Sequence, residues 1–164
     1  MIDYEFLRGR QNETVVQELC VASAAASETF RFKSPYKMAN HGSLENGLNW
    51  ADGHVEYKEL NPVITEAVTG FAHIYAHGVL KCTFLAGLTG RPIHNLEDLE
   101  CLPPTSFSHN YCCTLPCHKF PRFSCVTKIA HSLYVCLMYY LQKKDSVQCP
   151  TDMARHTVDF VAAL

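Results

Sequence analysis

Asp3 and Glu5 lie two positions apart in an otherwise apolar run near the start of the chain. In a β-strand, side chains at positions i and i+2 point to the same face. Two acids that face the same way are stabilised by a cation between them, and a divalent metal ion is the natural candidate. The alternative is an edge strand whose polar face lies in water. The pair therefore predicts either half of a metal site or a solvated strand edge.

Thiols and an imidazole cluster between residues 112 and 125. A structural zinc ion takes four such ligands in a tetrahedron, and a loop with prolines can wrap around it. The set that we expect is Cys113, Cys117, His118 and Cys125. Simultaneous ligation by two adjacent residues is awkward, so one of this set could be replaced by Glu100, Cys101 or His109. The alternative is a group of reduced thiols that only pack.

The remaining chemistry-bearing residues are cations and aromatic rings in the same loop. These residues are Lys119, Phe120, Arg122 and Phe123. Cations that alternate with aromatic rings are suited to phosphate contact and base stacking on single-stranded nucleic acid. Ordinary loop packing with solvated charges is the alternative. Three further thiols lie in apolar surroundings and are expected in the core: Cys20, Cys82 and Cys136.

The overall charge excludes a global basic field of the kind that drives nonspecific nucleic-acid binding. The 164 residues include 14 Lys and Arg against 16 Asp and Glu. The sequence shows no secretion signal or membrane-spanning run, so we expect an intracellular protein, nuclear or cytoplasmic, without a membrane partner. In that setting the nine cysteines indicate thiols and metal ligands rather than disulfides.

The elements that must position these residues begin with three short strands, predicted at residues 2–7, 15–22 and 29–33. The first two form a hairpin. A loop follows at residues 40–52, anchored by Trp50. Asn61 is expected to cap a helix whose first residue is Pro62.

The second half of the chain alternates between strands and helices. We expect a strand at 71–75, a helix at 82–88 that ends at Gly90, and a strand at 93–96. A cysteine-rich loop at 101–125 leads to the strongest helix, at about 126–142. This order predicts one α/β domain over residues 1–164, with a mixed sheet of about five strands and flanking helices.

The order of elements, with Asp-x-Glu on the first strand, resembles the DnaQ-like 3′-to-5′ exonuclease family of the ribonuclease H-like superfold. In that family two divalent ions, Mg²⁺ or Mn²⁺, activate water for phosphodiester cleavage. The resemblance implies that Asp3 and Glu5 bind metal and that His131 is the general base. The plan is also similar to that of the Maelstrom domain, which lacks the catalytic acids and has a zinc site between its sheet and last helix.

The chain departs from the exonuclease pattern at two of four acids. The family's second acid would fall at Lys81 or Cys82, and its third at Cys136. Asp52, Glu97 or Asp98 could substitute from elsewhere. His131 could equally be a helix histidine bonded to a nearby carbonyl.

Three hypotheses follow from these departures. The first is a degenerate exonuclease domain that binds nucleic acid or another partner with weak or no cleavage. The second is an active metal-dependent exonuclease on single-stranded DNA or RNA, and the third is a zinc-stabilised scaffold that binds protein.

Overall fold

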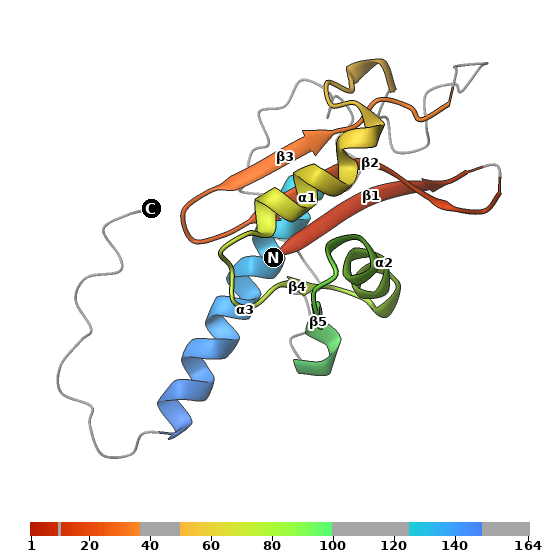
Figure 1. Cartoon of the computed structure of the whole chain (residues 1–164). Coiled ribbons are helices and arrows are strands. Elements are labelled where there is room, and N and C mark those ends of the chain that lie inside the picture. Colours follow the sequence, from red (N-terminus) through yellow and green to blue (C-terminus); the bar gives the residue numbers. More distant parts are fainter. Residues whose placement is uncertain (10, 37–49, 100–124, 149–164) are drawn as a thin grey trace.

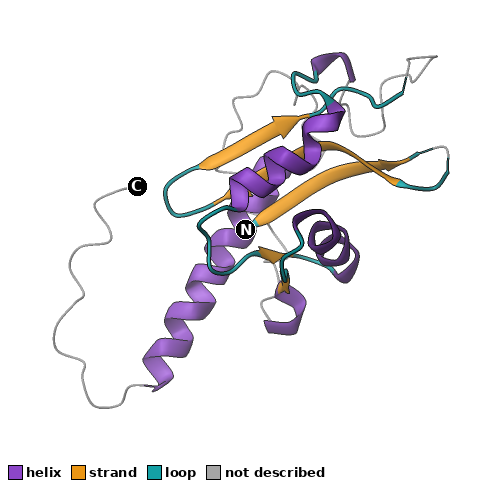
Figure 2. Ribbon diagram, viewed as in Figure 1, coloured by secondary structure: helices purple, strands orange, loops and turns teal. Residues whose placement is uncertain are grey.

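The structure, a computed structural model, describes residues 1–9, 11–36, 50–99 and 125–148. Its strands and helices form a mixed α/β arrangement with two small sheets (Figures 1 and 2). The expected α/β class is confirmed, whereas the expected single sheet of five strands is not: three antiparallel strands form one sheet, and two short parallel strands form another.

The three-stranded sheet consists of β1 (Ile2–Arg8), β2 (Thr14–Ala22) and β3 (Ser27–Arg31), in that order and all antiparallel. Alternation of apolar and polar residues in β1 predicts this arrangement, because one side of each strand then faces a core. The register shifts after Glu5, which pairs with Glu18, so that Gln17 is an extra residue in β2. Before this β-bulge, Asp3, Glu5 and the cross-strand partner of Glu5, Glu18, lie on one face of the sheet.

The two faces of this sheet are covered by different helices. One face packs its apolar side chains, Tyr4 and Leu19 among them, against α1 (Leu60–Val68) and α2 (Val79–Thr89). The opposite face packs against α3 (Val126–Gln148), which lies behind the strands in Figure 1. Because Asp3 pairs with Cys20, and Cys20 contacts α3, the acids lie on the side of the sheet that α3 covers.

The second sheet pairs β4 (Tyr75–Ala76) with β5 (His94–Asn95) in parallel. Strand β4 packs beside β1 but belongs to a separate sheet. The strands expected at 71–75 and 93–96 are thus shorter and shifted: Phe71 is 42% exposed, and a 3-10 helix (Leu96–Leu99) follows β5 directly.

Two further 3-10 helices precede α1, at Trp50–Asp52 and Tyr57–Glu59. Trp50 is buried, as expected for the anchor of its loop. The prediction that Asn61 caps α1 is wrong, because the second 3-10 helix leads straight into α1 and places Glu59 at the cap. Pro62 is still tolerated in the first turn, where a backbone N–H has no partner within the helix.

The other helix ends match the sequence more closely. Helix α2 ends at Gly90, whose φ of 64° is the left-handed conformation that glycine adopts without strain. It begins at Val79, three residues earlier than expected, after Gly78 with φ of 94°. Helix α3 begins at Val126 as predicted and continues to Gln148, beyond the predicted end.

Candidate functional site

Asp3 is the centre of the site, and its side chain is 1% exposed. Lys81, from the first turns of α2, donates to Asp3 Oδ1 and forms an ion pair with it. The same ammonium lies 5.3 Å from the ring centre of Tyr4, on the neighbouring position of β1. The interpretation of the acid pair as a solvated strand edge is therefore wrong for Asp3. The cation beside Asp3 in this structure is a lysine of the same chain.

The environment of Asp3 acts on its protonation in two directions. Burial raises the pKa of Asp3, because the charged form loses its hydration, and the charge and hydrogen bond of Lys81 hold that rise in check. The imidazole of His77 also favours the charged form. Asp3 Oδ2 is buried, with no hydrogen-bond partner among the described residues. Asp3 thus depends on Lys81 for its charge balance.

Glu5 lies on the same face of the sheet as Asp3, next to charged residues of β2 and β3. It pairs in register with Glu18, which pairs in turn with Arg31. The guanidinium Nε of Arg31 lies 2.9 Å from Glu18 Oε1, and the Glu18 side chain is 1% exposed. Burial raises the pKa of Glu5, and Asp3 and Glu18 raise it further, while Lys81 opposes them.

Glu18 is therefore a third carboxylate near Asp3 and Glu5 that sequence reasoning missed. A signal was present, since Glu18 stands among apolar residues at a position that faces the same way as Cys20. The hairpin register then brings it opposite Glu5. Two cationic side chains, Lys81 and Arg31, offset these three acids.

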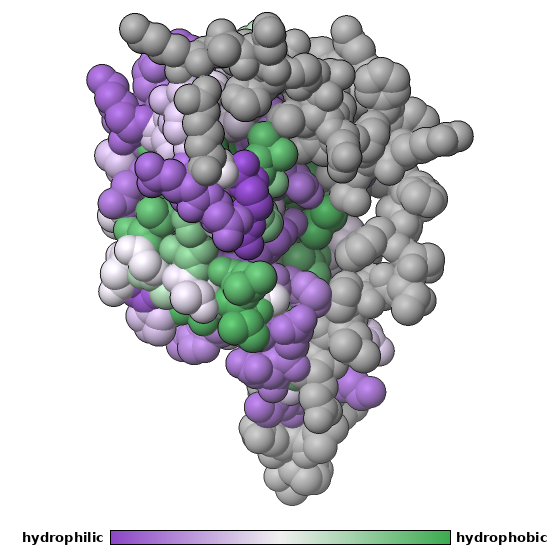
Figure 3. Space-filling view, turned by 90° about the vertical axis from the view of Figure 1, so that its right-hand side faces the viewer, coloured by the Kyte–Doolittle hydropathy of each residue, from purple (hydrophilic) through white to green (hydrophobic). Residues whose placement is uncertain are grey.

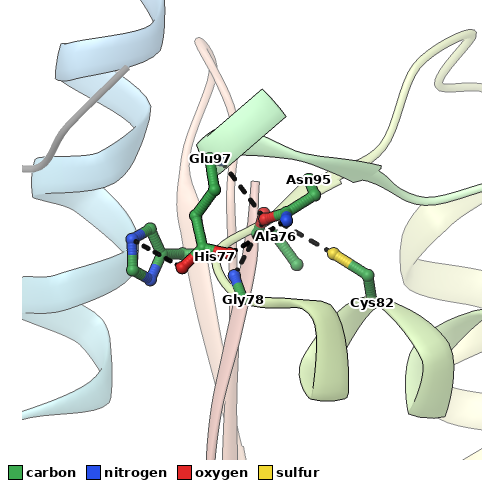
Figure 4. Close-up of polar contacts among 6 residues, drawn as sticks. All are labelled: Ala76, His77, Gly78, Cys82, Asn95 and Glu97. Atoms are coloured by element: carbon green, nitrogen blue, oxygen red, sulfur yellow. Dashed lines mark hydrogen bonds and ion pairs between the residues drawn. The ribbon is translucent and has the colours of Figure 1, made fainter. Parts of the chain in front are cut away.

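A polar cluster at the ends of β4 and β5 adjoins this site (Figure 4). The buried Asn95 accepts hydrogen bonds from the backbone N–H groups of Gly78, at 2.9 Å, and Glu97, at 3.3 Å. Its amide also donates to Glu97 Oε2 at 3.0 Å. The other carboxylate oxygen of Glu97 lies 3.9 Å from His77 Nε2. Asn95 thereby fixes both the start of α2 and the residue that faces His77.

His77 was not among the predicted site residues, although it directly follows β4. His131, the predicted general base, is half-buried on α3. His77 is a histidine whose electrostatic interaction with Asp3 favours the charged carboxylate. Of the acids considered as substitutes, Glu97 faces His77, and Asp98 lines a separate cavity of about 320 Å³ together with Cys82 and His94. Asp52 is exposed in the 3-10 helix that begins at Trp50.

No three Asp, Glu, His or Cys side chains are grouped so that they could hold a metal ion within the part of the chain that the structure describes. For the predicted zinc set, only Cys125 lies in this part; it is 4% exposed and immediately precedes α3. The other members lie outside the described residues, as do the alternatives to them: Cys113, Cys117, His118, Glu100, Cys101 and His109. The predicted nucleic-acid contacts, Lys119, Phe120, Arg122 and Phe123, also fall outside.

The expected core thiols have mixed outcomes. Cys20 and Cys82 are buried, as predicted, and burial raises the pKa of Cys20 to about 11. Cys136, on α3, is only half-buried, so the prediction that it lies in the core is not met. High thiol pKa values make Cys20 a poor nucleophile and a packing residue.

The surface around α2 includes exposed apolar residues, with Val79 at 64% and Leu80 at 73% exposure. Figure 3 views the molecule from this side and shows apolar patches among hydrophilic side chains.

Among residues 1–9, 11–36, 50–99 and 125–148, none of the helices is both long and apolar enough to span a bilayer.

Comparison of the chain with models of protein families, with curated proteins and with solved structures gave no match.

Proposed function

We propose that this chain is a degenerate DnaQ-like domain that does not cleave phosphodiester bonds and serves as a binding module. The observation that carries the proposal is the ion pair between Lys81 and the buried carboxylate of Asp3. In the exonuclease plan that the sequence resembles, an acid following the fourth strand would help Asp3 to bind a divalent ion. Here α2 supplies a cation from that place instead.

Electrostatics disfavour metal binding next to this ammonium. A divalent ion about 4 Å from a lysine charge meets a repulsion of about 8 kcal/mol at an effective dielectric constant of about 20. Lys81 already offsets the charge of Asp3, and Arg31 offsets that of Glu18. Glu5 is the remaining acid of the group, and a single carboxylate is a weak site for Mg²⁺ or Mn²⁺.

The order of elements supports the structural part of the proposal. The order along the chain is three antiparallel strands, then α1, β4, α2, β5 and α3. Strand β4 packs beside β1, and β5 pairs with β4 in parallel. In a ribonuclease H-like sheet the strands would have the same neighbours, joined by continuous hydrogen bonding. We propose that the two small sheets correspond to the two parts of such a sheet.

A cleavage and binding assay tests the function. The full chain is incubated with fluorescently labelled single-stranded DNA and RNA in Mg²⁺ or Mn²⁺, and both product formation and anisotropy are followed. We expect no cleavage, and binding that weakens with increasing salt. Cleavage that is lost in a folded Asp3→Asn variant would overturn the proposal. Absence of oligonucleotide binding would exclude nucleic acid as the partner and leave a protein partner.

A further inference from the structure

Two histidines lie side by side at the edge formed by β4 and β5. His73 comes two residues before β4, and His94 is the first residue of β5. Both side chains are exposed, and His73 Nδ1 lies 3.4 Å from His94 Nε2. The pair is separate from the Asp3 site, and neither the proposed function nor the predicted zinc set involves it.

The separation of these nitrogen atoms matches the spacing of two ligands on a tetrahedral zinc ion. Zinc–nitrogen bonds of about 2.0–2.1 Å at tetrahedral angles place two nitrogen atoms about 3.3–3.4 Å apart. A hydrogen bond between nitrogen and its acceptor prefers about 2.7–3.2 Å. The observed distance equals this ligand spacing, and it is also at the long end of the range for a direct hydrogen bond between the rings.

The backbone holds His73 and His94 next to each other without a metal. The N–H of His94 donates to the carbonyl of Ile74 at 2.8 Å, which ties β5 to the residue that follows His73. Tyr75 pairs in register with His94, and their ring centres are 5.1 Å apart. Because the backbone already places the two residues together, metal binding requires only that the exposed rings be ordered, which lowers its entropic cost.

We propose that His73 and His94 form a two-histidine site for a borderline transition-metal cation of the Zn²⁺ class. Imidazole nitrogen suits this class, whereas Mg²⁺ prefers oxygen ligands. The described residues offer no third grouped acid, thiol or imidazole here, and the exposure of both rings lets water complete the coordination. The site is therefore weaker than a four-ligand structural site.

This proposal is tested by titrating the ¹⁵N-labelled full chain with ZnCl₂ and following the NMR chemical shifts of the imidazole nitrogens. Because the readout is at individual histidines, zinc held by cysteines elsewhere is not counted. We expect His73 Nδ1 and His94 Nε2 to shift together at one zinc concentration, with His54 as the exposed reference and MgCl₂ without effect. His94→Ala should weaken zinc binding at His73 at least about tenfold, because chelation is lost.

The matched control is His54→Ala, which should leave the response of His73 and His94 unchanged. His73→Ala, read at His94, repeats the test from the other ring in case one substitution disturbs β5. The proposal is overturned if zinc shifts the pair no more than His54, if MgCl₂ shifts it equally, or if removing one ring leaves zinc binding at the other unchanged.

Discussion

Replacement of Lys81 by methionine removes the cation beside Asp3 and keeps most of the apolar stem. Asp3 is 1% exposed and the Lys81 side chain 25% exposed, so the variant has a buried carboxylate without its ion-pair partner. Loss of one partner of a buried pair costs about 3–5 kcal/mol, and the partial exposure of Lys81 reduces this to about 2–4 kcal/mol at neutral pH.

The pH dependence of this loss has a defined sign. In the wild type the pKa of Asp3 is already raised above 3.8, and without Lys81 it rises further. Between the unfolded and folded pKa values the folded state binds more protons, so stability falls as pH increases. Protonation removes the unpaired charge. The difference between Lys81→Met and the wild type should therefore be largest near pH 8 and shrink as the pH is lowered toward 5.

Urea unfolding followed by the fluorescence of Trp50, the single tryptophan, measures both effects. Lys58→Met is the matched control, because Lys58 is 80% exposed and lies 4.0 Å from Glu59, and it should change stability by at most about 0.5 kcal/mol. The double variant Asp3→Asn with Lys81→Met should lose less free energy of unfolding than Lys81→Met alone. Lys81 does not stabilise the charge of Asp3 if Lys81→Met is as stable as Lys58→Met, or if the stability lost in Lys81→Met does not vary with pH.

Three further predictions concern the neighbouring charges and the cysteine segment. Glu18→Gln breaks the buried pair with Arg31 and should lower the free energy of unfolding by about 2–4 kcal/mol in urea, whereas the same change at the exposed Glu56 should have little effect. Glu5→Gln should slightly stabilise the fold at pH 7, because burial and repulsion by Asp3 and Glu18 disfavour the charged carboxylate more than Lys81 favours it; a loss of stability in thermal unfolding would contradict this. If Cys125 and the predicted loop ligands hold structural zinc, a chelator should lower the melting temperature, and an unchanged melting temperature after zinc removal would exclude that role.

The hairpin and the long helix were predictable because their signals are local and repeated. Residues of β1 and β2 include clear apolar runs, and α3 begins at Val126 as its periodicity indicates. Gly90 marks the end of α2 for the same reason, since a left-handed position favours glycine. In each case a single segment of sequence contains the whole signal.

The parts that could not be predicted depend on contacts between distant segments. Strands β4 and β5 have two residues each, too few for a periodic pattern. The sequence places Lys81 where the family's second acid would fall, but only the packing of α2 beside Tyr4 of β1 brings it to Asp3. Glu18 becomes part of the acid group through the hairpin register, and Asn95 acts through hydrogen bonds from the backbone N–H groups of Gly78 and Glu97.

We propose that Lys81 takes the place of a metal ion beside Asp3. Paramagnetic broadening of backbone amide signals by Mn²⁺ tests it most directly, because broadening falls off steeply with distance from the ion. We predict that the amides of residues 3–5 stay sharp in the wild type at millimolar Mn²⁺. Selective broadening of these amides that disappears in Asp3→Asn would show that a metal binds there and would contradict the account.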